Sequence, residues 1–220
     1  MDWFPLWLSL QVAATATALA AVLGIGGGYL LAKGRFRGRG LLEALASLPI
    51  VLPPTVLGYY LLVLCGNDTV VGDTWQNVTG QPLVFTPAGA VLAATVASLP
   101  FCLRTARAAI ESVDPRLEQA ARTMGLPEWQ VAARVTLPLA RRGIIAGVAL
   151  GFARALGDFG ATVMVAGNIP GQTQTMPIAV YDAVQAGNDD RAALLAVILS
   201  LVAVAVAVLV LVNRFSRNAL

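Results

Sequence analysis

Histidine is absent from this chain of 220 residues, and its 12 acidic side chains are scattered along it. Histidine is the commonest metal ligand and the commonest general base, so its absence removes the usual centre of both kinds of site. The carboxylates form no metal cluster, and none of them stands beside a nucleophile that it could activate. The sequence therefore predicts that the chain is not an enzyme and binds no metal.

Charge is also too scarce for a water-soluble domain. Charged residues make up 12% of the chain and apolar residues 57%, against about 25% charged in a typical globular domain. The apolar residues gather in five blocks, each long enough to cross a hydrocarbon core, which takes about 20 residues. We therefore predict an all-α integral membrane protein with a single domain over residues 1–220. The predicted spans are residues 6–31, 44–64, 87–109, 143–166 and 192–212.

Lysine and arginine are distributed unevenly among the connections, and cytoplasmic loops retain positive charge. The N-terminus and the loops 65–86 and 167–191 hold only Arg191 between them, so we expect them to face outward. The chain is then N-out and C-in, and residues 111–138 form a cytoplasmic loop. The outer loop 66–82, rich in Asn, Asp, Gly and Thr, is predicted to form turns. The net charge of +3 follows from this topology, and nucleic acid is not an expected partner.

Only two cysteines are present. Cys65 falls near the outer end of the second predicted span and Cys102 toward the inner end of the third. The two thiols are then most of a bilayer apart, which is too far for a disulfide. Both are expected to be free, buried, small side chains.

The cytoplasmic loop carries the signals of two short helices. Asp114 and Pro115 are typical of a helix start, and Gly125 is typical of a helix end. A second helix is predicted from Pro127 to about Thr136, ended by Leu137-Pro138. An apolar stripe at helical spacing could enter a groove on a partner, or pack on the protein's own inner surface or on lipid headgroups. The stripe consists of Leu117, Ala120, Ala121 and Met124.

This loop resembles the cytoplasmic motif of the transmembrane subunits of type I ATP-binding-cassette (ABC) importers. The family motif is Glu-Ala-Ala, three residues, Gly, nine residues, Ile, any residue, Leu-Pro. Here Gln replaces the Glu and Val replaces the Ile, and the spacing agrees at every position. The matching residues are Gln119, Ala120, Ala121, Gly125, Val135, Leu137 and Pro138.

The resemblance implies the type I ABC importer permease fold, with the loop as a coupling helix seated in a cleft of an ATPase subunit. Glu118, beside Gln119, is expected to take over part of the missing carboxylate's role. The chain has no Walker motif, so ATP and Mg²⁺ are expected on a separate ATPase chain and no cofactor is expected on this one. The implied location is the inner (cytoplasmic) membrane of a prokaryote, as a multi-pass protein.

Residues 152–162, 167–171 and 175–177 resemble the molybdate and sulfate permeases, and residues 48–59 resemble the molybdate branch in particular. The resemblance implies a permease subunit that moves molybdate, a tetrahedral oxyanion, by alternating access. A sulfate or tungstate permease, and a stand-alone secondary anion transporter, stay open as alternatives. The implied partners are a second copy of the chain, two ABC ATPase subunits, a periplasmic or extracytoplasmic oxyanion-binding protein and the lipid bilayer.

The residues of the translocation pathway are predicted from breaks and charges within the spans. Pro53 and Pro54 interrupt the second span, as in transporters whose broken helices line a cavity, although a kinked packing helix is the alternative. Arg154 and Asp158 lie four residues apart in the fourth span. They either line the anion's route or form a structural ion pair. Asn168 lies in an outer segment whose backbone amides could face an entering anion or form a plain turn.

Overall fold

The computed structural model describes residues 2–34 and 36–215. This part of the chain is built from helices and loops and contains no β-strand, which confirms the predicted all-α class. The elements are α1 (Phe4–Lys33), α2 (Arg39–Val51), α3 (Pro54–Cys65), α4 (Val70–Thr79), α5 (Pro87–Glu111), α6 (Pro115–Thr123), α7 (Glu128–Val131), the π-helical segment η1 (Ala132–Thr136), α8 (Leu137–Leu156), α9 (Gly160–Ala166), α10 (Met176–Gln185) and α11 (Asp189–Phe215).

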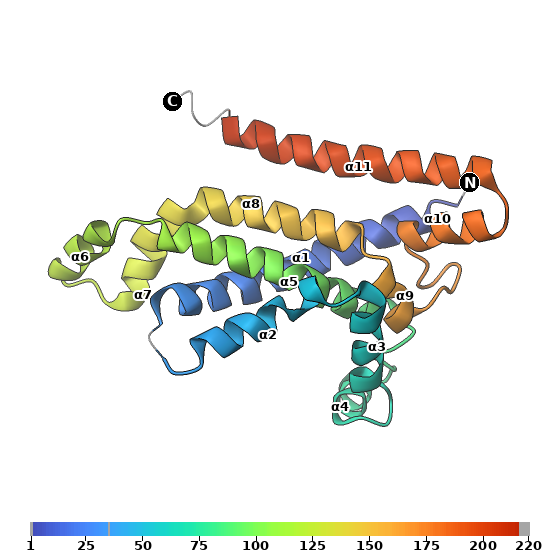
Figure 1. Ribbon diagram of the computed structural model, residues 1–220, viewed down its shortest axis with the longest axis horizontal. Coiled ribbons are helices and arrows are strands. Elements are labelled where there is room, and N and C mark those ends of the chain that lie inside the picture. Colours follow the sequence, from blue (N-terminus) through green and yellow to red (C-terminus); the bar gives the residue numbers. More distant parts are fainter. Residues whose placement is uncertain (1, 35, 216–220) are drawn as a thin grey trace.

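The long helices α1, α5, α8 and α11 run side by side along the longest axis of the molecule (Figure 1). Helix α1 packs mainly on α5 and also on α8, while α11 packs on α8 and α10. Helices α6 and α7 lie at one end of this bundle, and α9 and α10 lie toward the other end (Figure 1). The bundle therefore separates the predicted coupling loop from the predicted outer loops by its own length.

Small residues line the contact between α1 and α5. A Cβ added at Gly24 would lie 2.7 Å from the Cβ of Cys102, and one added at Gly28 would lie 3.0 Å from the backbone nitrogen of Arg107. Such residues let helix backbones approach closely in a membrane, where packing rather than the hydrophobic effect holds helices together. Buried alanines of both helices also join one core cluster; they are Ala13, Ala16, Ala90 and Ala94.

Three helical stretches in the described residues are long and apolar enough to cross a membrane: Phe4–Lys33, Pro87–Glu111 and Glu128–Leu156. The pair α2 and α3 makes a fourth if it is taken as one broken span. The last predicted span, 192–212, falls on α11, and its end lies outside the residues whose side chains are described. The count of five spans therefore stays a prediction.

The predicted interruption of the second span is present. Helix α2 ends at Val51, α3 begins at Pro54, and the two axes are bent by 116°. The break falls at Pro53-Pro54. Pro49, in contrast, lies inside α2 and does not end it. Helices α3 and α4 consequently project from the side of the bundle (Figure 1). Helix α4 itself corrects the prediction of turns in loop 66–82; the side chain of Thr69 accepts a hydrogen bond from the Gly72 backbone and starts this helix.

The predicted helix end at Leu137-Pro138 is wrong. Residues 128–156 form one helical stretch, in which η1 leads into α8 without a break. Pro138 falls in the first turn of α8, and the Leu137 backbone N–H donates to the Ala132 carbonyl five residues back. The wider π-helical turn changes the hydrogen-bond pattern just where proline lacks an N–H, so the helix continues through the proline.

Candidate coupling loop and translocation site

Helix α6, in the predicted coupling loop, begins and ends as its sequence predicts. The Asp114 carboxylate accepts a hydrogen bond from the Arg116 backbone at 2.9 Å, and Pro115 opens the helix. After α6, Gly125 adopts a positive φ of 83°. The Leu126 backbone N–H then donates to the Ala121 carbonyl at 3.3 Å. This is the Schellman arrangement, in which the left-handed position favours glycine because a Cβ there is strained.

The exposed apolar face of the loop differs from the predicted stripe. Leu117 and Met124 are 48% and 81% exposed and Ala120 is also exposed, but Ala121 is buried. Trp129 of α7, which the sequence analysis did not select, is 68% exposed. Helix α7 is too short to show a helical pattern in the sequence, and the exposure of Trp129 depends on how α7 lies beside α6. The surface that a partner would meet therefore combines Leu117, Ala120, Met124 and Trp129.

The adjacent residues Glu118 and Gln119 differ in exposure. Gln119 is exposed, whereas Glu118 is 3% exposed and its Oε1 lies 2.7 Å from the Lys33 Nζ of α1. The Thr136 hydroxyl also donates to this carboxylate, at 2.7 Å. Glu118 therefore does not offer its carboxylate at the loop surface, contrary to the expectation that it replaces a surface carboxylate at position 119.

A second ion pair holds the two short helices together at the surface. The Arg122 Nε and Nη2 donate to the two Glu128 carboxylate oxygens at 2.6 and 3.1 Å, in a two-pronged arrangement. This hydrogen bond is the main cause that raises the pKa of Arg122 above its ordinary value.

Among the last three motif residues, Leu137 attaches the loop to the bundle. Leu137 packs on a small core of Ile110, Val113 and Ala140, which joins α5 to α8. Val135 is half-buried and Pro138 is exposed. The motif thus contains both exposed residues, such as Gln119 and Ala120 on α6, and packed ones, such as Leu137 at the start of α8.

Helices α3 and α9 cross each other at glycines. A Cβ at Gly58 of α3 would lie 2.7 Å from the Met164 Cβ, and a Cβ at Gly160 would lie 2.8 Å from the Pro54 Cβ. Helix α9 consequently starts in direct contact with the start of α3. Pro53 and Pro54 are both exposed beside this crossing.

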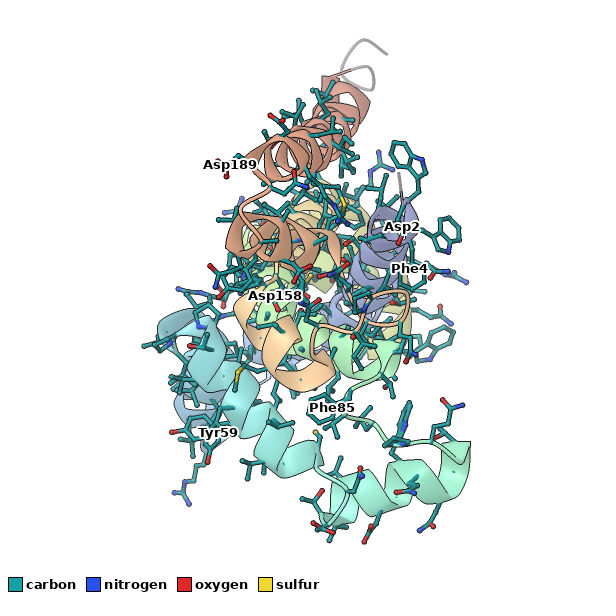
Figure 2. The ribbon with its side chains drawn as sticks, turned by 90° about the vertical axis from the view of Figure 1, so that its right-hand side faces the viewer. Asp2, Phe4, Tyr59, Phe85, Asp158 and Asp189 are labelled. Carbon is teal, nitrogen blue, oxygen red and sulfur yellow. The ribbon has the colours of Figure 1, made fainter. Side chains whose placement is uncertain are left out.

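Arg154 and Asp158 are paired, but not within one helix as predicted. Helix α8 ends at Leu156, Gly157 follows, and Asp158 lies in the break before α9. The buried Asp158 carboxylate accepts hydrogen bonds from Arg154 Nη1 at 2.8 Å, from the Thr162 backbone at 3.0 Å and from the Thr162 hydroxyl at 2.7 Å. Figure 2, which looks along the bundle, shows Asp158 among the helices and Tyr59 on the projecting α3. The carboxylate therefore both pairs with the arginine and starts α9.

Asn168 does not join these residues. It follows α9, accepts a hydrogen bond from Gln174 at 2.8 Å and donates one to Asp182 of α10 at 3.1 Å. The backbone amides of residues 172–174 all donate to the Ile169 carbonyl. These amides are already satisfied within the loop, which favours the plain turn over the anion-facing arrangement.

Comparisons with known proteins agree with the resemblance of the loop. Residues 24–219 match the family described as binding-protein-dependent transport system inner membrane component. The chain is 44% identical over 198 residues to the molybdenum transport system permease protein ModB of Escherichia coli (strain K12), covering 90% of this chain and 86% of that protein. It is 36% identical over 204 residues to the sulfate transport system permease protein CysW of Synechocystis sp., covering 93% and 74%.

A solved structure of the MetNI methionine ABC transporter in an inward-facing conformation shares the fold, with a TM-score of 0.76, 18% identity and coverage of 100% of both chains. At that identity the likeness concerns the fold alone. The family match, in contrast, covers nearly the whole chain, and the ModB relative is similar over most of its own length. The chain belongs to the family of binding-protein-dependent transport system inner membrane components.

Proposed function

We propose that this chain is the permease subunit of an ATP-driven importer that moves molybdate across the inner membrane of a prokaryote. The observation that carries the proposal is the 44% identity to a molybdenum permease over 90% of the chain. The sulfate permease relative, at 36% identity, belongs to a related branch and favours sulfate as the second candidate. The chain itself performs no covalent chemistry; it supplies the route and the means of opening it.

The loop surface of Leu117, Ala120, Met124 and Trp129, with Gln119 beside it, docks on the ATPase in this proposal. Its support is the exposure of large apolar side chains at the tip of a short helix pair, which is unusual for a loop facing water. ATP and Mg²⁺ bind to the ATPase. Because Gln119 stands beside this surface and the Glu118 carboxylate is buried, the contact depends on the shape of α6 more than on a carboxylate.

The pathway in this proposal runs past the crossing of α3 and α9, between two copies of the chain related by a two-fold axis. Arg154 makes the route tolerable for a dianion, and Asp158 keeps the arginine from holding the anion tightly. The support is geometric: a partly exposed guanidinium lies at the end of α8 beside a buried carboxylate. Transport requires binding that is weak enough to release the anion.

The orientation in this proposal is N-out and C-in, which places α6 and α7 in the cytoplasm. The loop between α9 and α10, with Asn168, then meets an extracytoplasmic oxyanion-binding protein. The support is the one-sided distribution of lysine and arginine.

The test is uptake of labelled molybdate by proteoliposomes that contain this chain with its ATPase and binding protein. We expect uptake that requires ATP and Mg²⁺ and that excess unlabelled molybdate abolishes, whereas the same excess of sulfate leaves it within about twofold. Stronger competition by sulfate would assign the chain to the sulfate branch. Uptake that persists without ATP or without the ATPase would instead indicate a stand-alone secondary transporter.

A further inference from the structure

Helix α6 has few attachments to the bundle. It packs on α7 and η1, which belong to the same loop. Among the described residues, its side-chain hydrogen bonds to other elements are those of Glu118 with Lys33 and Thr136, and those of Arg122 with Glu128. The contact with Lys33 is the one among these that reaches α1.

The buried Glu118 carboxylate contacts residues of two other elements. Its two carboxylate oxygens lie 2.7 and 2.9 Å from the Lys33 Nζ, and Oε1 also accepts the Thr136 hydroxyl. Lys33 is the last residue of α1, where a cation is favoured by the helix dipole. Thr136 is fully buried and is the last residue of η1, directly before α8. One carboxylate therefore connects α6, the end of α1 and the start of α8.

Helix α1 is also fixed near its opposite end. The Met176 backbone N–H, at the start of α10, donates to the buried Ser9 hydroxyl at 2.7 Å. Between Ser9 and Lys33, α1 packs closely on α5 through small residues and also packs on α8. A helix held at both ends and packed along its length transmits displacement as a rigid element.

We infer that Glu118 is a positioning residue that joins α6 to α1, so that a movement of the coupling loop is passed to α1 and along it to α10. The inference rests on the proposed function, because it assigns the path by which ATPase movement reaches the outer side. Glu118 acts through Lys33 and does not touch the anion.

The test uses the permease assembled with its ATPase and binding protein in proteoliposomes, with molybdate as the probe. The variants are E118Q and K33M, which remove either charge, K33R, which keeps the cation, and E118Q/K33M. The control is R39Q, which removes an exposed ion pair of 3.0 Å with Glu111 on the same side of the molecule. Two quantities are measured: the ATPase retained on the purified permease, and the molybdate imported per ATP hydrolysed.

We expect E118Q and K33M to retain the ATPase and to hydrolyse ATP, but to import about threefold less molybdate per ATP, or lower still. The double variant falls no further than either single variant, because both act on one contact. K33R restores most of the ratio, and R39Q equals the unmodified complex. K33M leaves α6 unchanged in sequence, so it tests the contact even where E118Q does not accumulate.

An unchanged ratio in the assembled E118Q or K33M complex would overturn the inference, and so would a loss of assembly with a normal ratio in the complex that remains. Either result would restrict Glu118 to holding the fold together. Absence of ATP-driven uptake in the unmodified complex would refute the proposed function itself. That result is seen before any variant is compared, so the two failures are distinguishable.

Discussion

Glu118 and Gln119 are neighbours in the sequence but differ in burial: Glu118 is buried and Gln119 is exposed. Glu118 and Gln119 are about 100° apart around α6, so only one of them can face the bundle. The buried carboxylate meets a lysine 85 positions earlier in the chain, a contact that α6 alone does not specify. Motif spacing predicted the coupling helix on this segment, but it did not identify the residue that faces inward.

Arg154 is the residue whose replacement best separates transport from folding. Without it, Asp158 still accepts two hydrogen bonds from Thr162, so α9 keeps its start. We expect R154Q to lower molybdate uptake about tenfold, equivalent to ~1.4 kcal/mol, while the assembled complex stays within about twofold. Uptake in proteoliposomes and yield by size-exclusion chromatography measure the two effects.

The matched control for R154Q is R104Q, which changes an exposed arginine of α5. It should leave both uptake and yield as they were. Parallel losses of uptake and assembled complex in R154Q would show that Arg154 serves only as a structural ion-pair partner.

At the level of elements, prolines and glycines have effects that depend on their surroundings. Pro53-Pro54 breaks a span, whereas Pro49 and Pro138 remain inside helices. Pro54 packs against Gly160 of α9, so the break is supported by a crossing helix. Pro138 follows a π-helical turn that already alters the backbone hydrogen bonds. Proline content alone therefore indicates where a helix can break, and tertiary contacts decide where it does.

The glycines of α1 allow the same substitution to be compared at two positions two residues apart. A Cβ at Gly24 would lie 2.7 Å from a side chain and 2.9 Å from the backbone of α5, while a Cβ at Gly26 meets nothing within 4 Å. We expect G24A to lower the free energy of unfolding by about 1–3 kcal/mol through overpacking. G26A should leave it unchanged or raise it, by up to ~1 kcal/mol, because alanine favours helix more than glycine does.

Thermal unfolding of the purified permease in one detergent measures both variants. A G24A protein as stable as the unmodified one would mean that α1 and α5 do not approach as closely as described.

The whole molecule presents a single bundle with a side projection made of α3 and α4 (Figure 1). One such bundle provides little polar lining for an anion, which is the reason for proposing that the pathway lies between two copies. The exposed prolines of the break and the half-exposed Tyr59 of α3 lie on this projection. A pathway between copies would bring these residues of both chains together.

For the assembled transporter we expect two copies of this chain and two ATPase subunits. Native mass spectrometry of the complex extracted in mild detergent measures this stoichiometry directly. A complex with one permease copy per two ATPases would contradict the two-fold arrangement. It would also require each bundle to contain a complete route.

Much of this protein follows from the sequence alone. Long apolar blocks are unfavourable in water, so the membrane class and the helical fold follow from composition. A capped loop with fixed motif spacing predicts the coupling segment. Gly125 was predictable because its backbone conformation is set locally. Local signals also indicated a break near Pro53-Pro54.

Tertiary structure decided which residues of those segments meet. It turned Glu118 and Ala121 inward, exposed Trp129, carried the helix through Pro138 and placed Asp158 in a break instead of within a helix. Some of these arrangements depend on contacts between residues far apart in the chain: Lys33 holds Glu118 inward, and Pro54 meets Gly160 at the start of α9. Helical periodicity specifies a face, but only the packing of other helices determines whether that face meets protein, lipid or water.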